Sequence, residues 1–215
     1  MRNFEINDED ILLVIDVQRD FCPGGALAIE DGDAVVQPIN VLAPHFKHIV
    51  LTQDWHTPRH HSFATSHANK SPYESVQTPY GLQTLWPDHC IQGTPGAEFH
   101  PDLNIPHVEL ILRKGFRASI DSYSAFLEND KTTPTGLAGY LRERGFTRIF
   151  LVGLAYDYCV RFSALDAAQA GFSAYVIEDA CRAVGLPGSV VETEEQFAAS
   201  GVHRIKSADL PIPKA

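Results

Sequence analysis

The stretch Ile11-Leu-Leu-Val-Ile-Asp16 is a continuous run of branched apolar residues that ends in an acid. Such a run is typical of a strand buried on both faces of a parallel sheet. Shorter runs of similar composition recur, and we expect a strand at each of 48–53, 108–113, 147–152, 172–177 and 202–205. Helical patterns separate these runs. The sequence therefore predicts a single three-layer α/β/α domain over residues 1–215, with a mainly parallel six-stranded, Rossmann-like sheet.

The connections between the strands carry helix signals. Thr133-Pro134 has the composition of an N-cap followed by a first-turn proline, for a helix that runs to Arg144. Ser189-Val-Val-Glu192 matches a capping box that opens a helix ending near Gly201. Two further helices are expected, over 33–46 and 159–170.

Composition narrows the partners. The 215-residue chain has a net charge of −10 and no basic cluster, so we expect no nucleic-acid partner. The apolar runs fall far short of the ~20 residues of a membrane span, so no membrane partner is expected. The N-terminus is acidic and lacks the apolar core of a signal peptide, which predicts a cytoplasmic protein. The four cysteines form no C-x-x-C pair, which favours free thiols over disulfides.

Four reactive side chains are expected at one edge of the sheet. Asp16, Asp54 and Lys114 each follow a predicted strand, and Cys159 begins a helix just after another. In an open parallel sheet, ligands bind beyond the carboxyl ends of the strands. A thiol at a helix N-terminus and near a lysine is a candidate nucleophile, because both stabilise the thiolate. The alternative, a small cysteine packed behind the sheet, stays open at this point.

Histidines gather in one long loop region. Eight of the ten lie between His45 and His100. The segment 54–106 is longer than a simple connection between two strands, which indicates a functional loop region. Asp54-Trp-His56 places a carboxylate and an imidazole on the same side of an extended segment, and His89 comes from the same region. An Asp with two His suits a divalent transition metal such as zinc or iron. The alternative is a loop of solvated histidines.

These residues together carry a family likeness. The chain resembles the nicotinamidase/pyrazinamidase branch of the isochorismatase-like cysteine hydrolases. The resemblance rests on segments in order along the chain: Val14 to Leu27, Asp54-Trp-His56, Leu85-Trp86-Pro-Asp-His89-Cys, Arg113-Lys114-Gly, Asp121-Ser-Tyr123-Ser and Gly153-Leu-Ala155-Tyr-Asp-Tyr-Cys159-Val. Any one segment is weak evidence, whereas six in order are specific.

The resemblance implies the roles of individual residues. It implies a catalytic triad of Cys159, Asp16 and Lys114. It implies an oxyanion hole from the backbone amides of Ala155 and Cys159, with a cis peptide before Ala155. The remaining implied roles are a metal site at Asp54, His56 and His89 for zinc, iron or manganese, and an aromatic pocket lined by Phe21, Leu27, Trp86 and Tyr123.

Two departures from the family pattern bear on the pocket. Tyr156 replaces a usual threonine and is expected to place a phenol beside the nucleophile, and Lys114-Gly-Phe-Arg117 replaces a more polar stretch. Whether His61 joins the metal ligands stays open. A homo-oligomer is one option for the assembly.

The expected activity is hydrolysis of nicotinamide to nicotinate and ammonia in NAD salvage, through a thioester on Cys159, with pyrazinamide as a further substrate. A related amidase acting on N-carbamoyl compounds ranks second, because those relatives lack the Asp–His–His set. An isochorismatase ranks lower, since that reaction does not use the cysteine. A silent binding module would have lost a triad member, and a metal-buffering protein would not explain Lys114 or Cys159.

Overall fold

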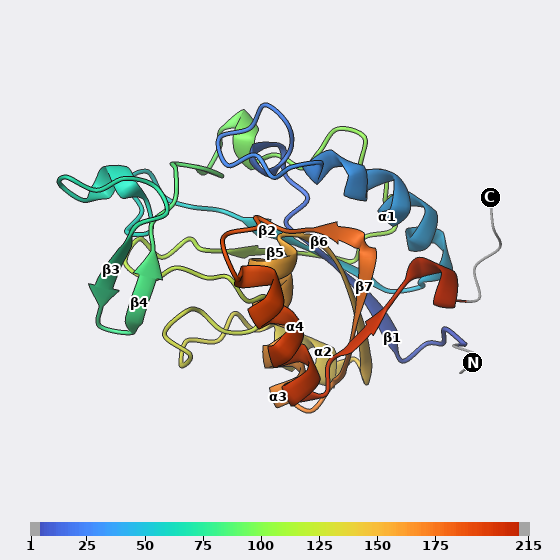
Figure 1. The fold of residues 1–215 in the computed structure, drawn as a ribbon. Helices are drawn as coiled ribbons and strands as arrows, with labels where there is room; N and C mark the ends of the chain where they lie inside the picture. Colours follow the sequence, from blue (N-terminus) through green and yellow to red (C-terminus); the bar gives the residue numbers. More distant parts are fainter. Residues whose placement is uncertain (1–4, 211–215) are drawn as a thin grey trace.

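The computed structural model describes residues 5–210 (Figure 1). Its main sheet has six strands in the order β5-β2-β1-β6-β7-β8, and every neighbouring pair is parallel. The strands are β1 (Asp10–Ile15), β2 (Ile49–Asp54), β5 (Leu110–Lys114), β6 (Arg148–Leu154), β7 (Ser173–Arg182) and β8 (His203–Ile205). The predicted six-stranded parallel sheet is confirmed.

Strand β1 explains why the fold has three layers. All six of its residues are buried, and it lies between β2 and β6. Because successive strand residues face opposite sides, Leu12 and Val14 enter one apolar cluster whereas Ile11 and Leu13 enter another. The first cluster holds the buried face of α1 (Val36–Leu42), and the second holds those of α2 (Leu137–Glu143), α3 (Arg161–Gln169) and α4 (Ser189–Ser200). Figure 1 shows α1 and the other three helices on opposite sides of the sheet.

Two expected helix starts are wrong. Helix α2 has Gly136 as its N-cap, because the Thr133 hydroxyl donates to Asp130 Oδ2 at 2.6 Å in the preceding turn. At α4 the N-cap is Gly188. Ser189 is already helical, and its hydroxyl donates to Asp157 Oδ2 at 2.5 Å, so there is no capping box. Helix α1 is shorter than 33–46, because 3-10 turns flank it on both sides.

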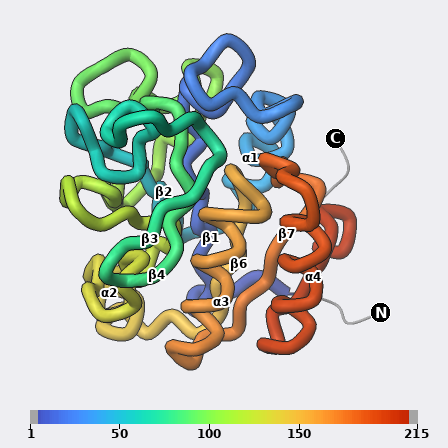
Figure 2. Tube along the Cα trace, turned by 60° about the vertical axis from the view of Figure 1, so that its left-hand side comes forward, coloured from blue at the N-terminus to red at the C-terminus, as the bar shows by residue number. Residues whose placement is uncertain are grey.

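The long loop region contains one feature that the sequence did not predict. Strands β3 (Ser75–Thr78) and β4 (Gly81–Thr84) pair as an antiparallel hairpin of their own, side by side in Figure 2. The hairpin forms a separate two-stranded sheet. All four cysteines are free thiols, as expected. Within residues 5–210, no helix is long and apolar enough to cross a membrane.

Candidate active site

The ends of three strands bring the expected triad together. Asp16 directly follows β1, Lys114 is the last residue of β5, and Cys159 lies in a π-helical turn (Tyr156–Val160) after β6. The Lys114 ammonium lies 2.8 Å from Asp16 Oδ2 and 3.5 Å from Cys159 Sγ. All three side chains are buried. An acid, a cation and a thiol therefore meet in one water-poor cluster.

The Asp16 carboxyl group is held on both of its oxygens. Thr52, on β2, donates its hydroxyl to Asp16 Oδ1 at 2.6 Å and accepts the Asp16 backbone N–H at 3.1 Å. The other oxygen, Oδ2, faces Lys114. Asp16 has a left-handed φ of 47°, which turns the chain sharply at the strand end. The orientation of the carboxyl group is thus fixed by two neighbouring strands.

Burial prevails over the neighbouring charges in the pKa values of Asp16 and Cys159, but not in that of Lys114. It raises the pKa of Asp16, although Lys114 acts in the opposite direction. It raises the pKa of the Cys159 thiol well above the usual range, and Lys114 offsets this only in part. Burial alone would lower the pKa of Lys114, but Asp16 and Asp54 raise it well above normal. Helix α3 begins at Arg161, after the π-helical turn that holds Cys159, rather than at the expected position 159.

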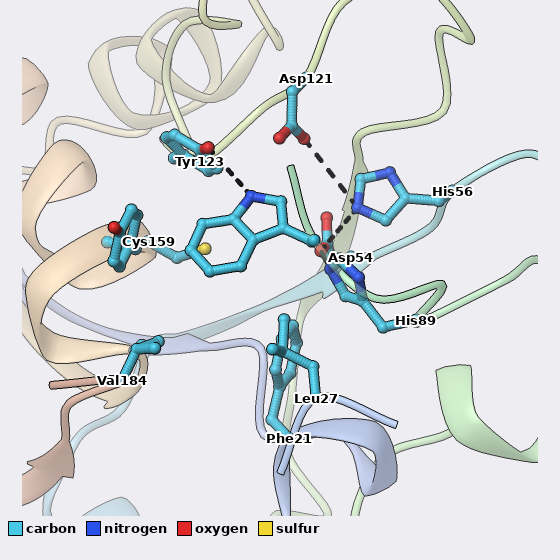
Figure 3. Close-up of a pocket in the computed structure, with 12 residues that line it drawn as sticks. Phe21, Leu27, Asp54, His56, His89, Asp121, Tyr123, Cys159 and Val184 are labelled. Atoms are coloured by element: carbon cyan, nitrogen blue, oxygen red, sulfur yellow. Dashed lines mark hydrogen bonds and ion pairs between the residues drawn. The ribbon is translucent and has the colours of Figure 1, made fainter. Parts of the chain in front are cut away.

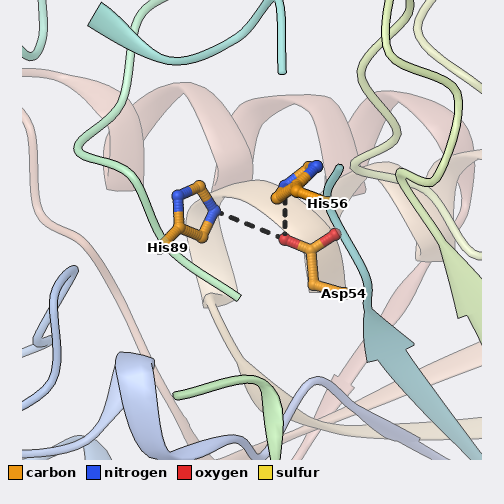
Figure 4. A group of neighbouring side chains, drawn as sticks. All are labelled: Asp54, His56 and His89. Carbon is orange, nitrogen blue, oxygen red and sulfur yellow. Dashed lines mark ion pairs between the residues drawn. The ribbon is translucent and has the colours of Figure 1, made fainter. Parts of the chain in front are cut away.

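The three expected metal ligands also lie together (Figure 4). Asp54 Oδ2 is 3.0 Å from His56 Nε2 and 3.4 Å from His89 Nε2. Each histidine turns its other nitrogen to a carbonyl oxygen, since Nδ1 of His56 donates to Gly115 O at 3.0 Å and Nδ1 of His89 to Pro87 O at 2.7 Å. Such hydrogen bonds fix the tautomer and leave both Nε2 lone pairs available to an ion.

Gly115 makes the close packing of this cluster possible. It has a left-handed φ of 69°, and a Cβ at this position would lie 2.7 Å from a His56 ring carbon and 2.9 Å from Asp54 Oδ1. Any other residue would push into the two ligands. The close approach of His56 and Asp54 therefore requires a glycine at position 115.

The charges and donor types at this cluster fit a divalent ion. Asp54, His56 and His89 offer ligand atoms that all lie within 4.8 Å of one another. Three carboxyl groups are buried here: those of Asp16 and Asp54 contact the Lys114 ammonium, and Asp121 Oδ1 lies 4.0 Å from His56 Nε2. Burial disfavours charge on Asp54, but His56 and Lys114 hold its pKa well below the usual range. A cation would compensate the surplus negative charge.

The neighbouring histidines are engaged elsewhere. His60 lies within ligand distance of His56 and Asp121, yet its Nε2 donates to Arg117 O at 2.8 Å and its Nδ1 accepts from Ser62 Oγ at 2.8 Å. His61 packs its ring against His67, with ring centroids 4.8 Å apart. Neither histidine belongs to the Asp54 group.

A mainly aromatic pocket opens beside both clusters (Figure 3). All four residues expected in it are present: Phe21, Leu27, Trp86 and Tyr123. Its lining further includes Ala155 and Cys159 together with the metal-ligand group Asp54, His56 and His89. The peptide bond between Leu154 and Ala155 is cis, as the resemblance implied. The pocket therefore joins an apolar ring-sized wall to the thiol and to the histidines.

The sequence misjudged part of the pocket wall. Tyr156 does not line it; this ring packs edge-on against Phe197 of α4 at 5.8 Å, and its hydroxyl lies 3.2 Å from Glu178 Oε1. Tyr158 and Val184 line the pocket instead. Asp121 lines it as well. Asp121 belongs to a segment that carries the family resemblance, but no role was predicted for its carboxyl group from the sequence.

A family model and a curated relative match most of this chain. The model of the isochorismatase domain matches residues 10–203. A nicotinamidase from Acinetobacter baylyi is 51% identical over 201 residues, 94% of each chain.

Solved structures of other proteins are also similar to this chain. A nicotinamidase/pyrazinamidase from Acinetobacter baumanii has a TM-score of 0.94 and 53% identity, covering 95% of this chain and 99% of its own. A pyrazinamidase from Pyrococcus horikoshii in complex with zinc has a TM-score of 0.75 and 34% identity, covering 92% and 99%. The chain thus belongs to the isochorismatase family.

Proposed function

We propose that this protein is a nicotinamidase, which hydrolyses nicotinamide to nicotinate and ammonia and accepts pyrazinamide as a second substrate. The observation that carries the proposal is the junction of Asp16, Lys114 and Cys159 at an aromatic pocket, in a chain 51% identical to a nicotinamidase. The pocket wall suits a flat heteroaromatic ring, and the thiol lies where a carboxamide carbon can be attacked.

In the first half of the reaction, Asp16 accepts the Cys159 proton as the sulfur attacks the carboxamide carbon. The C–N bond then breaks, ammonia leaves with the proton that Asp16 returns, and a thioester remains on Cys159. Water then adds to the thioester carbon, and the C–S bond breaks to release nicotinate and restore the thiol. The Lys114 ammonium contacts Asp16 Oδ2 at 2.8 Å and favours the ionised carboxylate that accepts the thiol proton.

The negative oxygen of each tetrahedral intermediate needs donors. We assign this role to the backbone N–H groups of Ala155 and Cys159, since both residues line the pocket. A well-placed donor of this kind contributes about 3 kcal/mol to transition-state stabilisation.

A divalent ion would be held by Asp54, His56 and His89. When bound, it would supply a positive centre to which a ring nitrogen or a water molecule can attach. One carboxylate and two imidazoles favour zinc, iron or manganese over calcium. The choice among the three ions stays a prediction, as do the single domain, the cytoplasmic location and a homo-oligomeric assembly.

The direct test is ammonia release from nicotinamide by purified protein, with Cys159→Ala as the matched control. We expect turnover by the wild type and background release by the variant. Nicotinate must appear in equal amount, because the reaction yields one molecule of each product. The proposal would be refuted if the metal-loaded wild type did not hydrolyse nicotinamide but released ammonia from an N-carbamoyl amide.

A further inference from the structure

Gln83, on the hairpin strand β4, reaches the wall of the pocket from outside the residues considered so far. Its side chain is buried, with 1% of the residue exposed. Its Nε2 lies 2.9 Å from Asp121 Oδ2 and 2.8 Å from the Tyr123 hydroxyl, both groups of pocket-lining residues. On the other side, its Oε1 accepts from Asn129 Nδ2 at 3.2 Å and from the Tyr80 hydroxyl at 3.2 Å.

The surroundings allow only one orientation of the Gln83 amide. Two acceptors, Asp121 Oδ2 at 2.9 Å and the Thr84 carbonyl oxygen at 2.7 Å, face its Nε2. Turning the amide by 180° would place its oxygen against both of them and would orphan the Asn129 donor. The NH₂ group therefore points to the pocket side, and this hairpin residue is a donor there.

This orientation constrains the hydroxyl of Tyr123. The amide nitrogen of Gln83 cannot accept from this hydroxyl; it shares its two hydrogens among Thr84 O, Asp121 Oδ2 and the hydroxyl oxygen, and Trp86 Nε1 also donates to that oxygen at 3.0 Å. A phenol oxygen that accepts two hydrogen bonds has only its own proton left to offer. Among residues 5–210, Tyr123 has no acceptor for that proton in its hydrogen bonds. The proton is therefore free for an acceptor atom of a molecule in the pocket.

We propose that Gln83 is a positioning residue for substrate binding, which together with Trp86 fixes the Tyr123 hydroxyl as a hydrogen-bond donor to the bound pyridine carboxamide. The proposal rests on the nicotinamidase activity proposed above. It assigns a function to the β3–β4 hairpin, because the buried Gln83 side chain connects this hairpin to Asp121 and Tyr123. The ligand needs one acceptor atom near Trp86, which a carboxamide or a ring nitrogen supplies.

The test compares Gln83→Met with Gln77→Met. Gln77 lies on β3 of the same hairpin and is exposed, and its side-chain Nε2 donates to the Thr78 carbonyl oxygen at 3.2 Å. We expect Gln83→Met to raise the KM for nicotinamide about tenfold with a smaller change in kcat, which is the loss expected for one buried hydrogen bond. Gln77→Met should keep the wild-type KM.

A double-mutant cycle with Tyr123→Phe separates positioning from general loosening. If Gln83 acts through the hydroxyl, Gln83→Met should add almost nothing to KM in the Tyr123→Phe background. A wild-type KM for Gln83→Met, or effects that multiply in the double variant, would overturn the proposal. If Gln83→Met does not fold, Tyr80→Phe removes a donor to Gln83 Oε1 and should raise KM about threefold, whereas an unchanged KM would overturn it.

The same variants are compared by calorimetric titration with nicotinate, which requires no turnover. A wild type that binds nicotinate without hydrolysing nicotinamide would refute the proposed function alone. The affinities of Gln83→Met and Tyr123→Phe would then still decide the role of Gln83.

Discussion

Replacing Lys114 by methionine should separate its charge from its packing. Methionine keeps an unbranched apolar stem of similar length but removes the ammonium. That ammonium contacts Asp16 Oδ2 at 2.8 Å, Asp54 Oδ1 at 3.2 Å and the Ser122 carbonyl at 2.9 Å, and the Lys114 side chain is 0% exposed. The variant leaves two buried carboxyl groups without their cation. We expect loss of turnover together with a large loss of folding stability.

The size of the stability loss follows from burial. Removing one partner of a buried ion pair costs about 3–5 kcal/mol, because the remaining charge stays desolvated. Lys47→Met is the matched control: its ammonium lies 2.8 Å from Asp8, the same distance as in the Lys114–Asp16 pair, but both side chains are exposed by 63% and 77%. This exposed pair should contribute nothing measurable. Urea unfolding of the metal-free proteins provides the comparison.

The loss should also depend on pH. Without the ammonium, the pKa of Asp16 in the folded state lies still further above its unfolded value, because burial is no longer opposed by Lys114. The folded variant then binds more protons than the unfolded chain, so its stability falls as pH rises. We expect a larger deficit at pH 8 than at pH 5. Equal stability of Lys114→Met and the wild type at both values would refute the view that this ammonium compensates the buried carboxyl groups.

Three other changes test the remaining parts of the site. Thr52→Val removes a hydrogen bond that lowers the pKa of Asp16, so the acid limb of the kcat/KM profile should move to higher pH, whereas Thr52→Ser should keep it. Cys159→Ala should still bind nicotinate in calorimetric titration, while its ammonia release falls to background. Normal turnover by this variant would exclude the thioester. If the ion anchors the ring, removal of the metal by a chelator should raise the KM for nicotinamide strongly, and His89→Ala should reproduce that effect. If the ion instead serves thioester hydrolysis, mass spectrometry of the chelated enzyme should find an acyl group on Cys159.

The sheet and the triad could be predicted because their signals are local. A continuous apolar run such as Ile11 to Ile15 has few alternatives to a buried strand, and β1 is indeed fully buried. Parallel strands share one carboxyl edge, so the residues that end them meet in space whatever the strand order. Asp16 and Lys114 were placed in this way, and the structure has them 2.8 Å apart.

The parts that could not be predicted depend on distant partners. Ser189 looks like a helix cap, but Asp157, 32 positions away, takes its hydroxyl. Tyr156 and Tyr158 flank the same acid, and only the π-helical turn decides that Tyr158 faces the pocket. Strands β3 and β4 are short and polar and pair only with each other, so no apolar period marks them.

The protonation of the cluster decides how the nucleophile has to be activated. Burial raises the pKa of the Cys159 thiol, which calls for a base that takes its proton as the sulfur attacks. In the proposed mechanism the ionised Asp16 carboxylate accepts the thiol proton, and the acid and the thiol both contact the Lys114 ammonium within 3.5 Å. When the thiol proton passes to Asp16, negative charge moves from carboxylate to sulfur while the same ammonium stays within reach of both atoms. The attack therefore shifts a charge already present in the cluster and creates no new one, which lowers its electrostatic cost in a site of low dielectric.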